Sequence, residues 1–469
     1  MKDAPRVALV SDYFYPKFGG VESHIIGLAS GLLRLGLHVI VITHSYGPEF
    51  SGKHELFLTP LATVSDVEDE TTITLTVYYL PVGIVAQNCM FPCLYPTLRF
   101  FPEIFEREKI NLVHGHSSMS AMVHEAIWHG KMLGLSTVIT DHSLIGFCDA
   151  GAIVTNKLLE GTLSDESTHV ICVSYCSSAN TIIRSNIPPP LVHVIPNGIS
   201  ASFNAAHFPP LTDTKTVRIV TCCRLEYRRG IDLLLAIIPR FCEEFPFVKF
   251  VIAGDGPYRV RLEETVRRHY LSDRVELKGV VPHKDLPELL STCHVFLNTA
   301  LTEAFCIAIC EAARMGLSIV SSNVGGIPEV LPRDLVRLSN PSPKELYASL
   351  TEAVTNIREG QGPSRKYISE KALTKYNWSD VCTRTVEIYR KSLGERKRTF
   401  EERLFKFRKV EFAGYFYQGV LVVHRSLFYM RNEMQINRFH VYFFLSFLMP
   451  SFFLYHIVYA FLRQYLSVA

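Results

Sequence analysis

The sequence predicts an α/β fold made of two domains, each built on a parallel β-sheet. At 469 residues the chain is too long for one core, and its 48% of hydrophobic residues is ample for two. In the first half, apolar runs alternate with helical patterns, which is typical of parallel sheets. The runs lie at 7–10, 38–43, 112–114 and 137–140, and the helical patterns at 21–35 and 121–133.

A second series of apolar runs predicts a second sheet, with strands at 217–222, 250–253, 275–278, 295–297 and 318–321. Between the two series, proline- and glycine-rich stretches interrupt the chain, so we place a linker at about 198–215. A helix is expected at 376–391, and the acidic stretch 67–70 is expected to be a solvated hairpin or insertion.

The most informative segment is 302–311, which places Glu303 and Glu311 eight residues apart. A strand is expected to end just before it, and a helix to cover 308–314. Glu303 would then lie in the turn and Glu311 about two helical turns further on, with both carboxylates on roughly one face. Such turns bind ligands in α/β proteins, and carboxylates suit hydroxyl-rich ligands. Taken alone, the pair fits solvated helix-end carboxylates better than a ligand site, and only the neighbouring motifs reverse this preference.

Arginines and glycines follow the other strand ends of the same half. Arg224 and Arg229 flank a turn that opens a helix at 231–238, where guanidinium groups and free N–H groups favour phosphate. A Gly-Asp-Gly-Pro turn begins at Gly254, and a Gly-Gly pair at 325–326 opens another helix. Each motif is weak alone, but the four occur in order within about 110 residues.

This ordered set resembles the C-terminal half of retaining GT-B glycosyltransferases of the glycogen-synthase and sucrose-synthase type. Together with Leu301–Cys306, four N-terminal segments resemble one family more closely, the catalytic subunits of phosphatidylinositol N-acetylglucosaminyltransferase: 10–24, 115–118, 140–144 and 171–175. The resemblance covers roughly residues 5–395. Arg229 stands where the family usually has Lys, which keeps the charge but changes its geometry. Ala304 departs from the wider superfamily, though not from this family.

The resemblance implies a GT-B fold of two Rossmann-like domains facing a cleft. Residues 1–200 would form the acceptor-side domain and 201–375 the nucleotide-sugar domain, with 376–395 a helix that crosses back. The implied reaction is transfer of N-acetylglucosamine from UDP-GlcNAc to phosphatidylinositol with retention, the first step of GPI-anchor biosynthesis. The alternatives are a phosphatidylinositol mannosyltransferase and a catalytically silent scaffold protein.

Negative charge grows on the diphosphate as the glycosidic bond breaks, so fixed cations accelerate the reaction. Arg224 and Arg229 are the candidates for this role. No Asp-x-Asp follows a strand, so we expect no metal and no other cofactor. We also name no protein nucleophile.

The remaining site residues follow from the resemblance. Glu303 would contact the donor sugar, and His142 would lie near the sugar being transferred, with His116 a weaker candidate. The donor nucleotide would be held by Glu311 on the ribose hydroxyls and by a set of glycines and one aromatic residue: Gly19, Gly20, Gly254, Gly256 and Phe305.

The C-terminal end predicts a membrane anchor. Residues 439–462 contain no acidic or basic side chain except histidine, and as a helix they would span about 36 Å. A buried helix would also be apolar, but it would not be expected at the terminus. Arginines precede this segment within the juxtamembrane region 396–438, which places the domains in the cytosol and 463–469 in the lumen. Residues 412–423 fit an interfacial helix or a core helix.

Charge and cysteine content complete the expectations. A net charge of +3 argues against a nucleic-acid partner. The 12 cysteines show no disulfide-like spacing, which indicates a reducing compartment. The first apolar run fits a strand rather than a signal peptide. We expect a single-pass protein of the endoplasmic reticulum membrane, with further small membrane subunits as partners.

Overall fold

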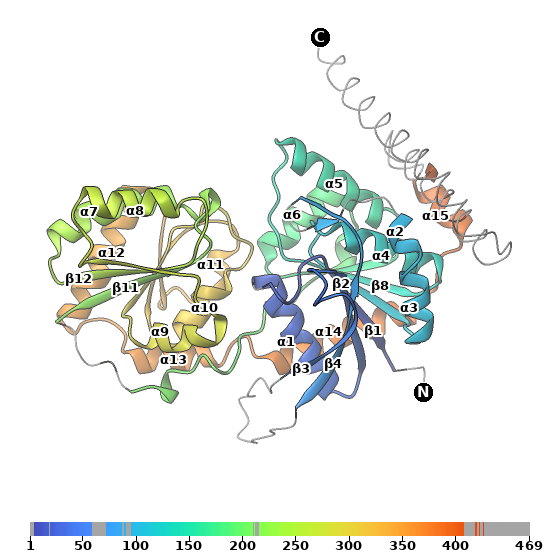
Figure 1. The fold of residues 1–469 in the computed structure, drawn as a ribbon, viewed down its shortest axis with the longest axis horizontal. Coiled ribbons are helices and arrows are strands. Elements are labelled where there is room, and N and C mark those ends of the chain that lie inside the picture. The colour runs from blue at the N-terminus through green and yellow to red at the C-terminus, as the bar shows by residue number, and fades with distance from the viewer. Residues whose placement is uncertain are drawn as a thin grey trace, which may run out of the picture.

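Two large β-sheets organise the chain, and helices cover both faces of each (Figure 1). A third, two-stranded sheet is formed by β5 (Ile84–Ala86) and β6 (Cys89–Met90). The computed structural model describes residues 4–17, 19–58, 72–86, 89–90, 95–209, 211, 215–407, 418, 419, 422 and 425. Each large sheet has two apolar layers packed on it, as expected for βαβ units. The predicted α/β class with two parallel-sheet domains is thereby confirmed.

The N-terminal sheet has eight strands in the order β10-β9-β8-β7-β1-β2-β4-β3. All neighbours are parallel except β3, which pairs antiparallel with β4 at the edge. The predicted strands here are β1 (Arg6–Val10), β2 (His38–His44), β7 (Leu112–His116) and β8 (Ser136–Asp141). The other elements are β3 (Gly52–Leu58), β4 (Ile73–Leu80), β5 (Ile84–Ala86), β6 (Cys89–Met90), β9 (Thr168–Cys172), β10 (Val192–Val194), α1 (Gly20–Arg34), α2 (Tyr95–Leu98), α3 (Phe101–Arg107), α4 (Ala121–Met132), α5 (Ala150–Leu163) and α6 (Tyr175–Ser185).

The C-terminal sheet has six parallel strands in the order β13-β12-β11-β14-β15-β16. Five were predicted: β11 (Val217–Cys222), β12 (Val248–Ala253), β13 (Val275–Gly279), β14 (Val295–Asn298) and β15 (Ser318–Ser322). The short edge strand β16 (Val336–Ser339) was not. The helices are α7 (Ile231–Glu244), α8 (Arg259–Arg268), α9 (Leu286–Ser291), α10 (Ile307–Arg314), α11 (Ile327–Val330), α12 (Pro343–Arg358) and α13 (Arg365–Leu373).

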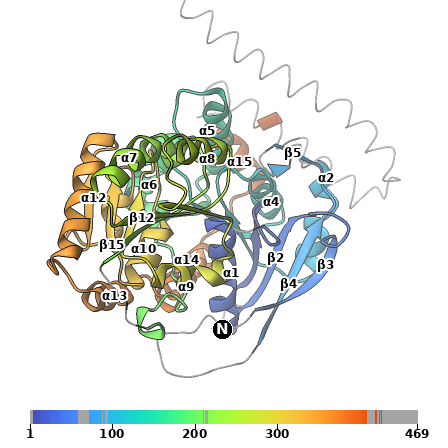
Figure 2. The same cartoon turned by 60° about the vertical axis from the view of Figure 1, so that its left-hand side comes forward.

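Helix α14 (Trp378–Gly394) returns from the second domain and packs on α1 of the first (Figures 1 and 2). Two glycines of α1 make the close approach possible. A Cβ on Gly27 would lie 2.1 Å from the ring of Trp378, and one on Gly31 would lie 2.3 Å from Sγ of Cys382. The chain therefore crosses back from the second domain just before α14, and α14 becomes part of the core of the N-terminal domain.

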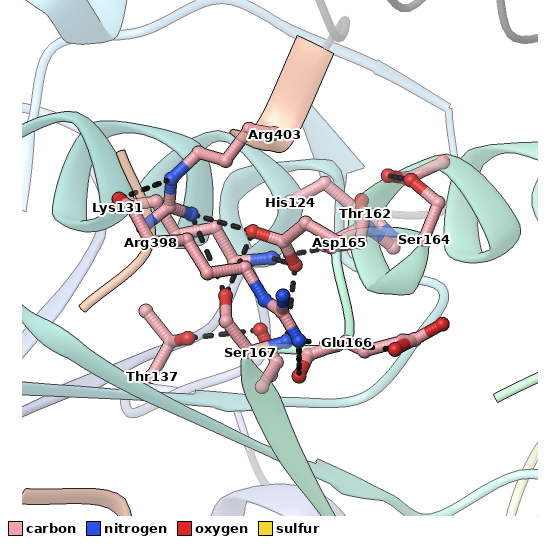
Figure 3. A network of polar contacts seen from close by, with 12 residues as sticks. His124, Lys131, Thr137, Thr162, Ser164, Asp165, Glu166, Ser167, Arg398 and Arg403 are labelled. Carbon is pink, nitrogen blue, oxygen red and sulfur yellow. Dashed lines mark hydrogen bonds and ion pairs between the residues drawn. The ribbon is translucent and has the colours of Figure 1, made fainter. Parts of the chain in front are cut away.

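A buried ionic network attaches the next helix, α15 (Phe400–Phe407), to the N-terminal domain (Figure 3). Asp165 forms ion pairs with Lys131 of α4, at 2.6 Å, and with Arg403 of α15. All three side chains are at most 6% exposed. Leaving one buried partner unpaired is costly, so the network fixes the position of α15.

No helix among the described residues is both long enough and apolar enough to cross a membrane. The predicted span 439–462 lies outside the described residues, as do the acidic stretch 67–70, the tail 463–469 and nearly all of 412–423.

Candidate active site

The carboxyl ends of the two sheets present helix N-termini toward each other. Gly19 and Gly20 open α1, and Cys306 precedes α10 on the other domain. A Cβ on Gly20 would lie only 3.8 Å from Cδ1 of Ile307, the first residue of α10. Each helix N-terminus offers free N–H groups and partial positive charge, so the junction suits an anionic ligand.

Arg229 and Glu303 form an ion pair at the centre of the C-terminal side. Two loops are tied together to make this contact. Gly230 adopts φ +67°, and a Cβ there would lie 1.8 Å from the carbonyl oxygen of Thr299. The hydroxyl of Thr299 in turn donates to the carbonyl of Arg229 at 2.9 Å. The glycine after the second arginine is therefore needed for close packing of the β11 and β14 loops.

Arg224, by contrast, points into solvent, with its side chain 70% exposed. Its one ion pair is a long contact of 3.7 Å with Glu226. Across the domain junction, burial raises the pKa of Glu22 in the first turn of α1, and the charges of Arg224 and Lys17 oppose that shift. Arg224 therefore lies near the N-terminal domain and keeps its guanidinium available to a ligand.

Gly254 and Gly256 lie beneath the Arg224 turn. A Cβ on Gly254 would lie 1.8 Å from the carbonyl oxygen of Cys223, and one on Gly256 would lie 2.6 Å from that of Leu225. Both residues also have positive φ. Packing of the two loops therefore accounts for these glycines, and a contact with the nucleotide stays a prediction.

Glu311 is 6% exposed, and its Oε1 lies 2.8 Å from Nε2 of His283. Burial opposes the charged imidazole, but the hydrogen bond and the charge of Glu311 raise the pKa of His283. Because α10 begins at Ile307, Glu311 lies one turn into the helix, where two turns were expected. Glu303 lies before the helix, so the two carboxylates have different partners. His283 was missed because nothing in the sequence links it to Glu311.

Phe305 is 3% exposed and packs edge-on against Tyr376, with ring centroids 5.2 Å apart. Its side chain therefore belongs to the core that supports the Glu303 turn, and a direct contact of Phe305 with the donor stays a prediction.

Glu329 joins the two domains. Its carboxylate accepts hydrogen bonds from the backbone N–H groups of Tyr175, at 2.6 Å, and Cys176, at 2.8 Å, in the first turn of α6. The preceding Gly326 packs against this region, since a Cβ there would lie 2.7 Å from Oγ of Ser174 and 2.0 Å from the carbonyl of Ala304. The Gly-Gly-Ile-Pro-Glu motif signalled this segment, but its spacing did not reveal the contact between domains.

His142 follows β8 on the N-terminal side, next to the buried ion pair of Asp141 and Arg184 at 2.9 Å. Two other histidines lie against it. His142 is 4.7 Å from His24 of α1 and 5.7 Å from His116 of β7, measured between ring centroids. Burial lowers the pKa of His142 to about 3, so its ring is neutral at physiological pH.

The structure thus brings Arg229 and Glu303 together and places Arg224, Gly19 and Gly20 at the same junction. His142 lies on the opposite side with His24 and His116. The arginines at the junction therefore come from the C-terminal domain, and the neutral imidazoles come from the N-terminal domain. This arrangement suits reaction of an anionic donor with an acceptor held between the domains.

Known families match both parts of the chain. The family PIGA (GPI anchor biosynthesis) matches residues 69–149, and the family of glycosyl transferases group 1 matches residues 202–374. Among solved structures, a sucrose-phosphate synthase of Thermosynechococcus elongatus has a TM-score of 0.64 at 19% identity, covering 82% of this chain and 98% of its own. Anabaena HepE in complex with UDP-glucose has a TM-score of 0.61 at 17% identity, covering 82% and 99%. These likenesses establish the two-domain GT-B fold.

Proteins related by sequence have higher identity to this chain than these solved structures do. Over 384 residues the chain is 43% identical to the A subunit of phosphatidylinositol N-acetylglucosaminyltransferase from Homo sapiens, a match that covers 82% of this chain and 75% of that protein. The Arabidopsis thaliana protein of the same name is 43% identical over 403 residues, covering 86% and 85%. The chain therefore belongs to the family of phosphatidylinositol N-acetylglucosaminyltransferase A subunits, and it is a glycosyltransferase.

Proposed function

We propose that this chain transfers N-acetylglucosamine from UDP-GlcNAc to phosphatidylinositol with retention, as the first step of GPI-anchor biosynthesis. The names of its relatives support the reaction. The observation that carries the proposal is the Arg229–Glu303 pair at the junction of two helix N-termini, with the exposed Arg224 beside it.

In the proposed reaction, Arg224 and Arg229 contact the diphosphate of the donor. Negative charge develops there as the bond to the sugar breaks, and fixed cations stabilise that charge more strongly in the transition state than in the ground state. Glu303 orients Arg229 and contacts the donor sugar, and Glu311 contacts the ribose. The acceptor hydroxyl attacks from the face that UDP leaves. Because arginines carry the charge, the proposed reaction uses no metal ion.

The acceptor is a lipid, so we propose that residues 439–462 anchor the chain in the endoplasmic reticulum membrane with both domains in the cytosol. Small membrane subunits would complete the transferase. Asn377 lies in a formal glycosylation motif and caps α14 by accepting a hydrogen bond from the N–H of Asp380 at 2.8 Å. In the proposed orientation this motif stays on the cytosolic side, where glycans are not transferred. Asn377 should therefore be unmodified, and protease added to sealed microsomes should digest both domains.

The test is transfer of radiolabelled sugar to phosphatidylinositol in membranes from a host that lacks its own activity. UDP-GlcNAc should give a lipid-linked product with retained anomeric configuration, and unlabelled GDP-mannose should not compete. Competition by GDP-mannose would instead indicate a phosphatidylinositol mannosyltransferase. Equal product from wild type and Glu303→Ala would indicate that the chain is a scaffold.

A further inference from the structure

Three histidines from distant segments meet where the N-terminal sheet borders the cleft. His24 comes from α1, His116 from the end of β7, and His142 from the position directly after β8. One nitrogen of each ring lies within 4.8 Å of the others. In the described part of the chain, this is the only group of three or more histidine, cysteine or acidic side chains close enough to hold a metal ion.

The ring of His116 shows two different environments. Its Nδ1 lies 3.4 Å from Nε2 of His142, on the side of the cluster, and its Nε2 is buried without a hydrogen-bond partner. The side chain of Asn197 lies within hydrogen-bonding reach of His24.

The neighbouring His114 shows that a fully satisfied histidine is possible in this layer. Its Nδ1 lies 2.7 Å from the hydroxyl of Tyr389, and its Nε2 lies 2.7 Å from that of Thr140. Burial in this layer therefore does not by itself leave a histidine nitrogen unpartnered, although Nε2 of His44 in β2 also lacks a partner.

Imidazole nitrogens are common metal ligands, and three histidines with an open fourth position are a known zinc-binding set.

The geometry points to a Zn²⁺ site formed by His24, His116 and His142, and we propose that an ion bound there blocks sugar transfer. Zn–N bonds of about 2.0–2.1 Å place two nitrogen ligands of one tetrahedral ion roughly 3.4 Å apart. Nδ1 of His116 and Nε2 of His142 are already 3.4 Å apart, which is long for a hydrogen bond between two rings. Only a small movement of His24 is needed to complete the set.

The ion would enter from the cleft. His24 and His116 are 4% and 0% exposed, whereas His142 is only partly buried. The loop after His142 faces the other domain, since a Cβ on Gly325 would lie 2.7 Å from Leu144. The fourth coordination position would therefore face the expected place of the transferred sugar. The blocking effect rests on the proposed function, but the binding of zinc does not.

Binding is tested on the full chain after EDTA washing, by competition with a chromophoric zinc indicator. Wild type should bind one Zn²⁺ per chain. His24→Gln and His142→Gln should each weaken zinc binding at least about 100-fold. Loss of a residue that only hydrogen-bonds to a metal ligand lowers metal affinity about 10–100-fold, and loss of a ligand itself should lower it more. Mg²⁺ should not compete, because it prefers oxygen ligands.

Two control variants exclude other zinc ligands. His193→Gln removes a histidine of the same domain that pairs with His169 at 2.9 Å, away from the cluster. Cys148→Ser removes an exposed thiol on the loop that follows His142. Both should bind zinc like wild type. Absence of binding in wild type, or unchanged binding in both cluster variants, would overturn the proposed site.

Inhibition is measured in the transfer assay, as a fraction of the zinc-free rate of each protein. Zinc should inhibit wild type reversibly, with full recovery on adding EDTA, and His24→Gln should need at least about 100-fold more zinc. Zinc bound at the cluster without inhibition would refute the blocking role. A wild type with no transfer activity would instead count against the proposed function, while the binding measurements would still decide the site.

Discussion

The two domains use charge in opposite ways. In the N-terminal domain the ion pairs Asp141–Arg184 and Asp165–Lys131 are almost fully buried and hold elements together. In the C-terminal domain the Arg229–Glu303 pair is partly exposed at the cleft, and Arg224 is mostly exposed. The N-terminal side of the cleft presents neutral histidines instead.

This difference separates structural charges from functional ones. The two charges of a buried ion pair neutralise each other and are not accessible to a ligand. Removing one of them leaves the other buried without a counter-charge. An exposed arginine adds little to stability, so its presence beside the cleft indicates another use. Mutations in the two domains should therefore affect different measurements.

The largest effect is expected on stability, at Asp165. Asp165→Asn leaves Lys131 and Arg403 buried without a counter-charge and should lower the free energy of unfolding by about 3–5 kcal/mol. The measurement is chemical unfolding at pH 7. Glu370→Gln, which breaks the exposed pair with Lys366, is the control and should cost less than about 1 kcal/mol. Equal costs would show that burial does not distinguish the two pairs.

The same network predicts a pH dependence. Burial alone would raise the pKa of Asp165, but the charges of Lys131 and Arg403 outweigh burial and lower it below 3.8. A carboxylate with a depressed folded-state pKa stabilises the fold above its unfolded value, and this contribution is lost as pH falls through the folded pKa. The difference in stability between wild type and Asp165→Asn should therefore begin to shrink below about pH 4 and disappear only below the folded-state pKa. A constant difference down to pH 2 would contradict this account.

The next effect is on rate, at the exposed arginine. Arg224→Ala should reduce kcat by about 10²–10³, because a charge-assisted contact used in the transition state contributes roughly 3–4 kcal/mol. Its melting temperature should stay unchanged, since Arg224 has only one long ion pair. Arg229→Lys should keep substantial activity because the charge remains.

The matched control for Arg224 is its neighbour Arg228, which is also exposed. Arg228→Ala should change kcat by less than about twofold. Normal activity in Arg224→Ala would reject the phosphate role, and an inactive Arg229→Lys would show that the planar guanidinium is needed at that position.

A smaller effect is expected at the contact between domains. Glu329→Gln keeps one acceptor for the N–H groups of Tyr175 and Cys176 but removes the negative charge at the start of α6. Charge-assisted hydrogen bonds contribute about 1.5–3 kcal/mol, so kcat/KM should fall about tenfold with little change in stability. Glu345→Gln, on the exposed start of α12, provides the comparison. A loss of stability without a loss of activity would make Glu329 purely structural.

The sequence predicted the C-terminal domain better than the N-terminal one, and the reason is physical. In the second half, the candidate residues Arg224, Gly254 and Glu303 lie within five positions of a strand end, so β11, β14 and their loops could be located from local patterns. The sequence pattern predicted only turns around Gly230 and Cys306. In the structure both residues have positive φ, which fixes the geometry of their loops.

The N-terminal side is assembled from distant segments. His24, His116 and His142 meet only because β1, β7 and β8 are adjacent in the sheet, and strand order is not encoded in any local motif. The same limit hid the pairing of Glu311 with His283. The antiparallel edge strand β3 was also missed, since its exposed pattern follows no crossover helix.

The smallest effect is expected from chelation, and it tests whether the arginines are sufficient. If Arg224 and Arg229 stabilise the leaving diphosphate, EDTA should not lower the rate of transfer by more than about twofold, and added Mg²⁺ or Mn²⁺ should not raise it. Arg224→Ala, assayed with and without Mn²⁺, is the informative comparison, because a metal ion could replace a lost cation but should add nothing to wild type. A rate abolished by EDTA and restored by Mn²⁺ would show that the charge on the donor is neutralised by a metal ion. The exposed arginines of the C-terminal domain would then have no role in catalysis that distinguishes them from the buried ion pairs of the N-terminal domain.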